Sequence, residues 1–219
     1  MISTPDLIDS LVAEAQPVRP LRPPVVRALC WLLFAALMLM LVALGHGVRP
    51  DLMLKLQQPV FTTGVAAALT TGILAAIASF IASIPGRSQR WMLLPAPALA
   101  LWLSTIGYGC LTNWVSIGAD GISPGETARC LATLAVTGIP LSLVMLIMLR
   151  HVARLSPAPV AMTASLAVAA MTAVALSMFH PFDATVMILL WNFGAATLLL
   201  TLSGLYGRRL FEWVAPQGR

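Results

Sequence analysis

Two cysteines, Cys110 and Cys130, are the residues of this chain whose type and spacing could do chemistry. An apolar stretch ends at the first cysteine and another apolar stretch begins at the second. If both stretches cross a membrane, the two thiols lie at the same surface, each at the end of a helix. On an oxidising extracytoplasmic face they could form a disulfide or remain thiols that react. Reactivity needs thiolate character, which Arg129 beside Cys130 would favour; the alternative is an inert structural pair.

His180 and Asp183 are expected at the same surface as the two thiols. Together with Cys110 and Cys130, His180 could complete a site for a soft metal ion such as zinc, cadmium or copper(I). The other interpretation, which we favour, is that Asp183 caps a helix and His180 forms hydrogen bonds among lipid headgroups. A disulfide that forms or breaks would shift one helix end against another, which is sufficient for a switch.

Composition indicates which elements position these residues. Hydrophobic residues make up 59% of the chain and charged residues only 10%. A soluble domain has about 25% charged and about 45–50% apolar residues. This chain therefore cannot cover its surface with polar groups, and we expect lipid to be its solvent. The net charge of +5 comes from basic residues at the ends of apolar stretches, which is a membrane-topology pattern and does not indicate nucleic-acid binding.

Six apolar stretches are long enough to cross a membrane, since about 20 residues span a hydrocarbon core of roughly 30 Å. They lack the alternation of barrel strands, so we expect helices. The sequence predicts an all-α polytopic membrane protein with six transmembrane helices at roughly Val25–Gly45, Pro59–Ile84, Trp91–Leu111, Ala128–Leu149, Ala158–Phe179 and Ala184–Tyr206. Pro95 and Pro97 should make the start of the third span irregular, and Pro140 should kink the fourth.

Basic residues predict the orientation of these spans. Of the 13 lysines and arginines, only Arg49, Lys55 and Arg129 lie on one side of the predicted bundle, and the other ten lie on the opposite side. The positive-inside rule therefore places both termini in the cytoplasm. The first apolar stretch starts too late and is too long for a cleavable signal peptide, so we expect it to stay as a membrane span.

Residues 1–24 form the only sizeable polar segment. Thr4-Pro5-Asp6 is typical of a helix start, and apolar residues then recur at helical spacing opposite acidic ones. A stiff, Pro-rich spacer follows. Because so short a helix is marginal in water, its apolar stripe needs a partner. It could lie on lipid headgroups, but its acidic face better fits a groove on a basic cytoplasmic protein. The residues expected to bind are Asp6, Leu7, Ile8, Asp9, Leu11 and Val12.

The sequence lacks the groups that transport or soluble catalysis would need. No Asp, Glu or Lys lies in the middle of a predicted span, whereas coupled transporters normally carry such groups at membrane depth. No CxxC, P-loop, HExxH or GxSxG motif occurs, so we expect no enzyme. A small membrane transporter or thiol-redox enzyme, with Asn192 as its modest buried polar candidate, is the alternative.

The chain is expected to divide into a cytoplasmic segment 1–24, a transmembrane domain 25–210 and a cytoplasmic tail 211–219.

Several short motifs together resemble one family. The motifs are Asp6-Leu7-Ile8-Asp9-Ser10-Leu11, Pro17-Val18-Arg19-Pro20-Leu21-Arg22-Pro23-Pro24, Gly107-Tyr108-Gly109-Cys110, Arg129-Cys130, His180-Pro181-Phe182-Asp183 with Trp191, and Gly207-Arg208-Arg209. Each is weak alone, but the combination covers nearly the whole chain. It resembles the NrsF family, the negative regulators of sigma F.

The resemblance implies a six-span anti-sigma factor of the proteobacterial inner membrane. Its cytoplasmic N-terminal segment would hold an ECF-type sigma factor and release it under oxidative or heavy-metal stress. The family's sensing cysteines correspond to Cys130 and Cys110. His180 stands where many relatives have Cys, before the Pro181 and Asp183 of the last outer link, and Asn192 stands after Trp191 where relatives often have His. The resemblance then leaves a Cys110–Cys130 pair or a mixed Cys/His site for a transient zinc or cadmium ion, with no resident cofactor.

Overall fold

The computed structural model describes residues 4–14, 22–84, 86–113, 124–149, 157–179 and 201. These residues form helices and short connections, without a strand in this part of the chain. The elements are α1 (Thr4–Glu14), α2 (Pro24–His46), α3 (Leu52–Leu56), α4 (Pro59–Ala82), the 3-10 helix η1 (Gln89–Leu93), α5 (Ala96–Asn113), α6 (Pro124–Leu149) and α7 (Pro157–Phe179). The predicted all-α class is confirmed for the described residues.

Five helical segments of the described chain are long and apolar enough to cross a membrane: Pro24–Gly45, Pro59–Ala82, Arg90–Tyr108, Ala132–Leu149 and Val160–Phe179. They correspond to the first five predicted spans. The sixth predicted span, Ala184–Tyr206, lies outside the described residues except for Thr201. The count of six and the orientation of the termini therefore stay predictions.

Prolines determine where the long helices begin. Pro24, Pro59, Pro124 and Pro157 each occupy the first position of a helix. The fixed φ of proline suits that position, and its missing N–H removes no intrahelical hydrogen bond there. Before α5, the predicted irregular start is the 3-10 helix η1, whose first turn is capped by the Ser88 hydroxyl accepting from the Arg90 N–H at 3.3 Å.

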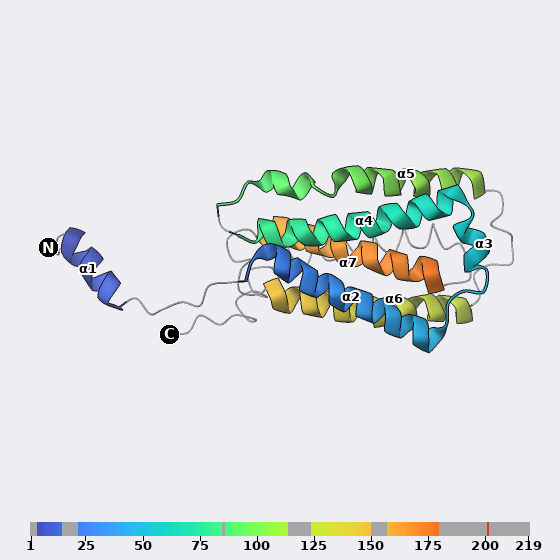
Figure 1. Ribbon diagram of the computed structural model, residues 1–219, viewed down its shortest axis with the longest axis horizontal. Helices are drawn as coiled ribbons and strands as arrows, with labels where there is room; N and C mark the ends of the chain where they lie inside the picture. Colours follow the sequence, from blue (N-terminus) through green and yellow to red (C-terminus); the bar gives the residue numbers. More distant parts are fainter. Residues whose placement is uncertain are drawn as a thin grey trace.

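Helix α4 occupies the centre of the bundle and packs against α7, α5 and α2 (Figure 1). Its buried face is mostly small: Ala67, Ala68, Thr71, Gly72, Ala75, Ala76, Ala78, Ser79 and Phe80. Small side chains let helices approach closely where lipid supplies no hydrophobic driving force between them. A Cβ on Gly72 would stand 3.1 Å from Cε of Met171 on α7, and a Cβ on Gly64 would stand 3.1 Å from Oγ1 of Thr105 on α5.

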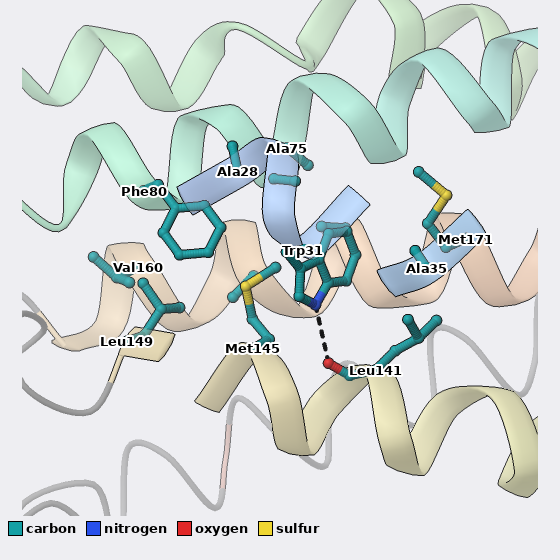
Figure 2. Packing of buried hydrophobic residues seen from close by; sticks show 13 residues of the cluster. Ala28, Trp31, Ala35, Ala75, Phe80, Leu141, Met145, Leu149, Val160 and Met171 are labelled. Atoms are coloured by element: carbon teal, nitrogen blue, oxygen red, sulfur yellow. Dashed lines mark hydrogen bonds between the residues drawn. The ribbon is translucent and has the colours of Figure 1, made fainter. Parts of the chain in front are cut away.

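The larger core cluster joins α2, α4, α6 and α7 around two buried aromatic rings. Trp31 of α2 and Phe80 of α4 are both fully buried, next to Leu141 and Met145 of α6 (Figure 2). The same cluster contains small residues of α4 and α7, namely Ala75, Ala76, Ala164 and Ala167. A second cluster, around Trp102 of α5, joins α5 to α4 and α7. Helix α6 is thus linked to the bundle through α2 and α7, and α5 mainly through α4.

The helices alternate in direction, which gives the bundle two distinct ends (Figure 1). At one end, here called the α1 end, α2 and α7 begin and α4 and α6 finish. At the other, here called the α3 end, α3 connects α2 to α4, α5 and α7 finish, and α6 begins. Helix α1 stands apart from the bundle on the side where α2 begins.

Candidate functional site

The predicted partner-binding residues all fall within α1, which spans Thr4–Glu14. Asp6 lies in its first turn, where a negative charge complements the helix dipole. Asp6 and Asp9 are exposed, and Val12 exposes 69% of its surface. The side chains of Leu7, Ile8 and Leu11 lie outside the described ones. The helix therefore presents carboxylates and at least one apolar side chain to its surroundings.

Both predicted sensing cysteines lie inside helices at the α3 end. Cys110 is in the last turn of α5, which continues to Asn113, and Cys130 is in the second turn of α6, which begins at Pro124. The two helices lie on opposite sides of the bundle, with α4 and α7 between them (Figure 1). Helix packing by itself therefore does not set the two positions side by side, and the positions of the thiol groups lie outside the described side chains.

The predicted metal site and outer link also fall outside the described residues. His180, Pro181, Asp183 and Trp191 belong to that part of the chain, as does Asn192. Among the residues that the structure describes, no group of three or more His, Cys, Asp or Glu side chains is placed to hold a metal ion. The choice between a disulfide and a metal site stays a prediction.

Two buried arginines are features that the sequence does not reveal. Arg27, on the first turn of α2, is only 8% exposed. Its guanidinium Nη2 donates a hydrogen bond to the carbonyl of Met148, and its Cζ lies 5.0 Å from the centre of the Phe80 ring. The sequence indicates only that Arg27 marks the cytoplasmic side. The structure shows that it joins α2, α4 and α6 at the α1 end.

Arg49 has the corresponding place at the α3 end. Its Nε and Nη2 each donate to a carboxylate oxygen of Asp51 at 2.7 Å, and its Cζ lies 5.9 Å from the Phe61 ring. Its backbone N–H donates to the carbonyl of Met178 in the last turn of α7 at 3.2 Å. The hydrogen bond from Arg49 lowers the pKa of the Asp51 carboxyl below its ordinary value. The turn between α2 and α3 is thereby tied to α4 and α7.

Buried hydroxyls inside the bundle bond to their own helices. Thr71 donates to the Ala67 carbonyl at 2.7 Å, and Thr137 donates to the Thr133 carbonyl at 2.7 Å. Ser79 likewise donates to a carbonyl of α4, one turn earlier. Such back-bonding is a usual way to satisfy a hydroxyl within a transmembrane helix. The hydroxyls of these buried residues are therefore satisfied within their own helices.

Comparison with known proteins supplies the family. A family model described as NrsF, negative regulator of sigma F, matches residues 11–213, nearly the whole chain. Comparison with curated proteins and with solved structures gave no significant match. The family description implies regulation of transcription through a sigma factor, and the apolar helices of the described part indicate association with a membrane. The chain belongs to the NrsF family of negative regulators of sigma F.

Proposed function

We propose that this protein is an anti-sigma factor of the bacterial inner membrane. In this proposal α1 holds an ECF-type sigma factor in the cytoplasm and releases it when Cys110 and Cys130, facing outward, meet an oxidant or a heavy-metal ion. The observation that carries the proposal is the separation along the bundle axis. An exposed acidic helix stands beyond one end, and the two cysteine-bearing helix segments lie at the other.

The case for α1 as the sigma-binding element rests on its length and charge. A helix of 11 residues is marginal in water without a partner. Interfacial helices that bind lipid usually carry Lys and Arg on the polar face, whereas α1 exposes Asp6 and Asp9. An amphipathic helix with an acidic face suits an apolar groove rimmed by basic residues. Leu7, Ile8, Leu11 and Val12 would be its apolar anchors.

The case for the cysteines rests on orientation and on thiol chemistry. If the positive-inside rule holds, the α3 end faces the oxidising extracytoplasmic side. There, an oxidant can take two electrons and two protons from a pair of thiols and leave a disulfide. Alternatively, both thiolates with His180 can bind a soft ion such as zinc or cadmium. Either event changes the α3 end of α5 and α6 without a resident cofactor, and Pro181, Asp183 and Trp191 would support this outer face.

The proposal is tested by deleting residues 2–16 from the full-length protein while leaving every span intact. Membranes that contain the wild-type chain should retain the sigma factor, and membranes that contain the deletion variant should not. A matched control removes residues 212–219 from the other predicted cytoplasmic segment and should keep retention. Retention by the first variant, at equal membrane levels of both proteins, would contradict the assignment of α1.

A further inference from the structure

Two side chains of α2 donate hydrogen bonds to the main chain of α6. Arg27 donates to the Met148 carbonyl, and the Trp31 indole Nε1 donates to the Leu141 carbonyl at 3.2 Å (Figure 2). The donors are four residues apart on α2 and therefore share one face. The acceptors are seven residues apart on α6, two turns along one face. The two helices run in opposite directions (Figure 1), so the pairs follow each other in order along the seam.

The two acceptor carbonyls lie at different kinds of position in α6. Met148 is the residue before the last of α6, and the last four carbonyls of a helix have no intrahelical donor. The Arg27 guanidinium supplies that donor and places a positive charge at the negative end of the helix dipole. Leu141 directly follows Pro140, the proline inside α6. Proline is a usual place for a helix to bend, so Trp31 binds α6 one residue after the position where a bend is expected.

Both donors lie where an unmade hydrogen bond is costly. Trp31 is fully buried, and Arg27 is 8% exposed with its guanidinium beside the Phe80 ring of α4. A buried donor without an acceptor keeps its full desolvation penalty. Sliding or rotation of α6 against α2 would break both bonds together. The seam therefore favours one register of the two helices over its neighbours.

We propose that Arg27 and Trp31 are the positioning residues that couple α6 to the start of α2, where the N-terminal segment 1–24 ends in the sequence. This inference rests on the proposed function. Cys130 lies 18 positions before Met148 on the same helix, about 27 Å away at 1.5 Å per residue. A displacement of the Cys130 end of α6 reaches Leu141 and Met148 through the helix itself. The two hydrogen bonds then pass it to the first two turns of α2.

This route is shorter than the one from the other cysteine. Helix α6 packs directly on α2, whereas α5, which carries Cys110, reaches α2 through α4. Arg27 lies three residues after Pro24, the first residue of α2, so the displacement arrives at the end of α2 that is nearest to α1 in the sequence. The register seen here is the holding state, and release requires that α6 leave it.

The test compares Trp31→Phe with Trp102→Phe in the full-length protein. Both remove a buried indole N–H and keep an aromatic ring, but Trp102 lies on α5 in the second core cluster and not at the seam. Loss of one hydrogen bond of this kind shifts a two-state equilibrium about fivefold. We expect Trp31→Phe to raise the free, cytosolic fraction of the sigma factor about fivefold without stress and to lower the cadmium chloride or diamide dose for half-release. Trp102→Phe should leave both values unchanged.

Two further measurements separate coupling from misfolding and from failure of the proposed function. Maleimide labelling of Cys110 and Cys130 after each treatment should be the same in both variants, because Leu141, the nearer acceptor of the seam, is 11 residues along α6 from Cys130 and Cys110 lies on another helix. Arg27→Met should act as Trp31→Phe does, while Arg27→Lys, which keeps a charged donor, should lie near wild type. Equal behaviour of Trp31→Phe and Trp102→Phe in a protein that otherwise holds and releases its sigma factor would overturn the coupling alone. Failure of the wild-type chain to hold a sigma factor would overturn the proposed function.

Discussion

Arg49 and Asp51 form a bidentate ion pair at the α3 end, with both nitrogen–oxygen distances at 2.7 Å. The Arg49 side chain is only 2% exposed, whereas that of Asp51 is 39% exposed. The carboxylate thus lies between the buried guanidinium and the surroundings and supplies its counter-charge. Because the backbone of Arg49 also bonds to Met178 of α7, this pair helps to fix the end of the bundle at which α5 finishes and α6 begins.

Replacing Asp51 with Asn should therefore destabilise the protein. The guanidinium of Arg49 would keep a neutral amide acceptor but lose the carboxylate charge, and a hydrogen bond between two charged groups is stronger than one to a neutral acceptor. We expect a lower Tm in detergent than for the wild type. Asp9→Asn, which changes an exposed carboxylate of α1, is the matched control and should leave the Tm of the bundle unchanged.

The pH dependence of that difference has a definite sign. The hydrogen bond from Arg49 lowers the pKa of Asp51 below its ordinary value of 3.8. A carboxyl group whose folded-state pKa is lowered stabilises the fold above its unfolded pKa and loses this contribution as the pH falls through the folded pKa. The Tm difference between wild type and Asp51→Asn should stay constant from about pH 7 to about pH 5 and shrink only in stronger acid. A loss of the difference near neutral pH would assign it to another group.

The close contact between α4 and α7 gives a prediction about packing. A larger side chain at Gly72 would meet Met171 and the Cβ of Ala170, whereas a Cβ on Gly107 of α5 meets nothing within 4 Å. Overpacking a core typically costs about 1–3 kcal/mol. We expect Gly72→Leu to lower the stability by at least that amount and Gly107→Leu to change it little. Thermal unfolding in detergent measures both, and equal Tm values for the two variants would contradict the helix approach described here.

Local signals in the sequence were sufficient for the elements but not for the contacts between them. Thr4-Pro5-Asp6 predicts the start of α1 because a helix start depends on adjacent residues, and the structure has a helix from Thr4. Apolar length likewise predicts the first five spans. The bond of Arg27 to Met148 joins residues 121 positions apart, and it follows only from how α2, α4 and α6 pack.

The same limit applies to the candidate sensing site. The lengths of the apolar stretches predict that Cys110 and Cys130 lie near helix ends, and in the structure both positions lie within helices at the α3 end. The position of α4 and α7 between α5 and α6 depends on which helices pack together. The sequence could not predict it, because hydrophobic periodicity does not tell which helices are neighbours. The two arginines were likewise assigned to topology from the sequence, because a single basic residue at a span end has the same pattern whether or not it is buried in a contact.

Replacing the candidate sensing thiols should separate holding from release. We expect Cys110→Ser and Cys130→Ser to insert and to hold the sigma factor as the wild type does, because neither lies near α1. Release by diamide or cadmium chloride should be lost or strongly reduced. Cys30→Ser is the matched control, since this exposed cysteine lies near the start of α2, away from the α3 end. An unchanged release by the double variant Cys110→Ser/Cys130→Ser would remove these thiols from the mechanism.

Charge reversal on α1 tests how the sigma factor is held. Asp6 and Asp9 are exposed and lie within the first two turns of the helix, so both can approach a basic surface. We expect Asp6→Lys/Asp9→Lys to slow association with the sigma factor and to weaken retention at least tenfold at low salt, with a smaller difference at high salt because screening weakens exposed charges. Retention by the neutral variant Asp6→Asn/Asp9→Asn should lie between that of the wild type and that of the charge-reversal variant.

The apolar side of α1 is tested by Val12→Asp, at a side chain that is 69% exposed. This variant should weaken retention at every salt concentration, because it would bring a charge into an apolar groove. Binding kinetics measured on wild-type and variant proteins in detergent would distinguish the contribution of the acidic side chains from that of the apolar ones. If the charge reversal left retention unchanged, the apolar stripe alone would be the element that binds.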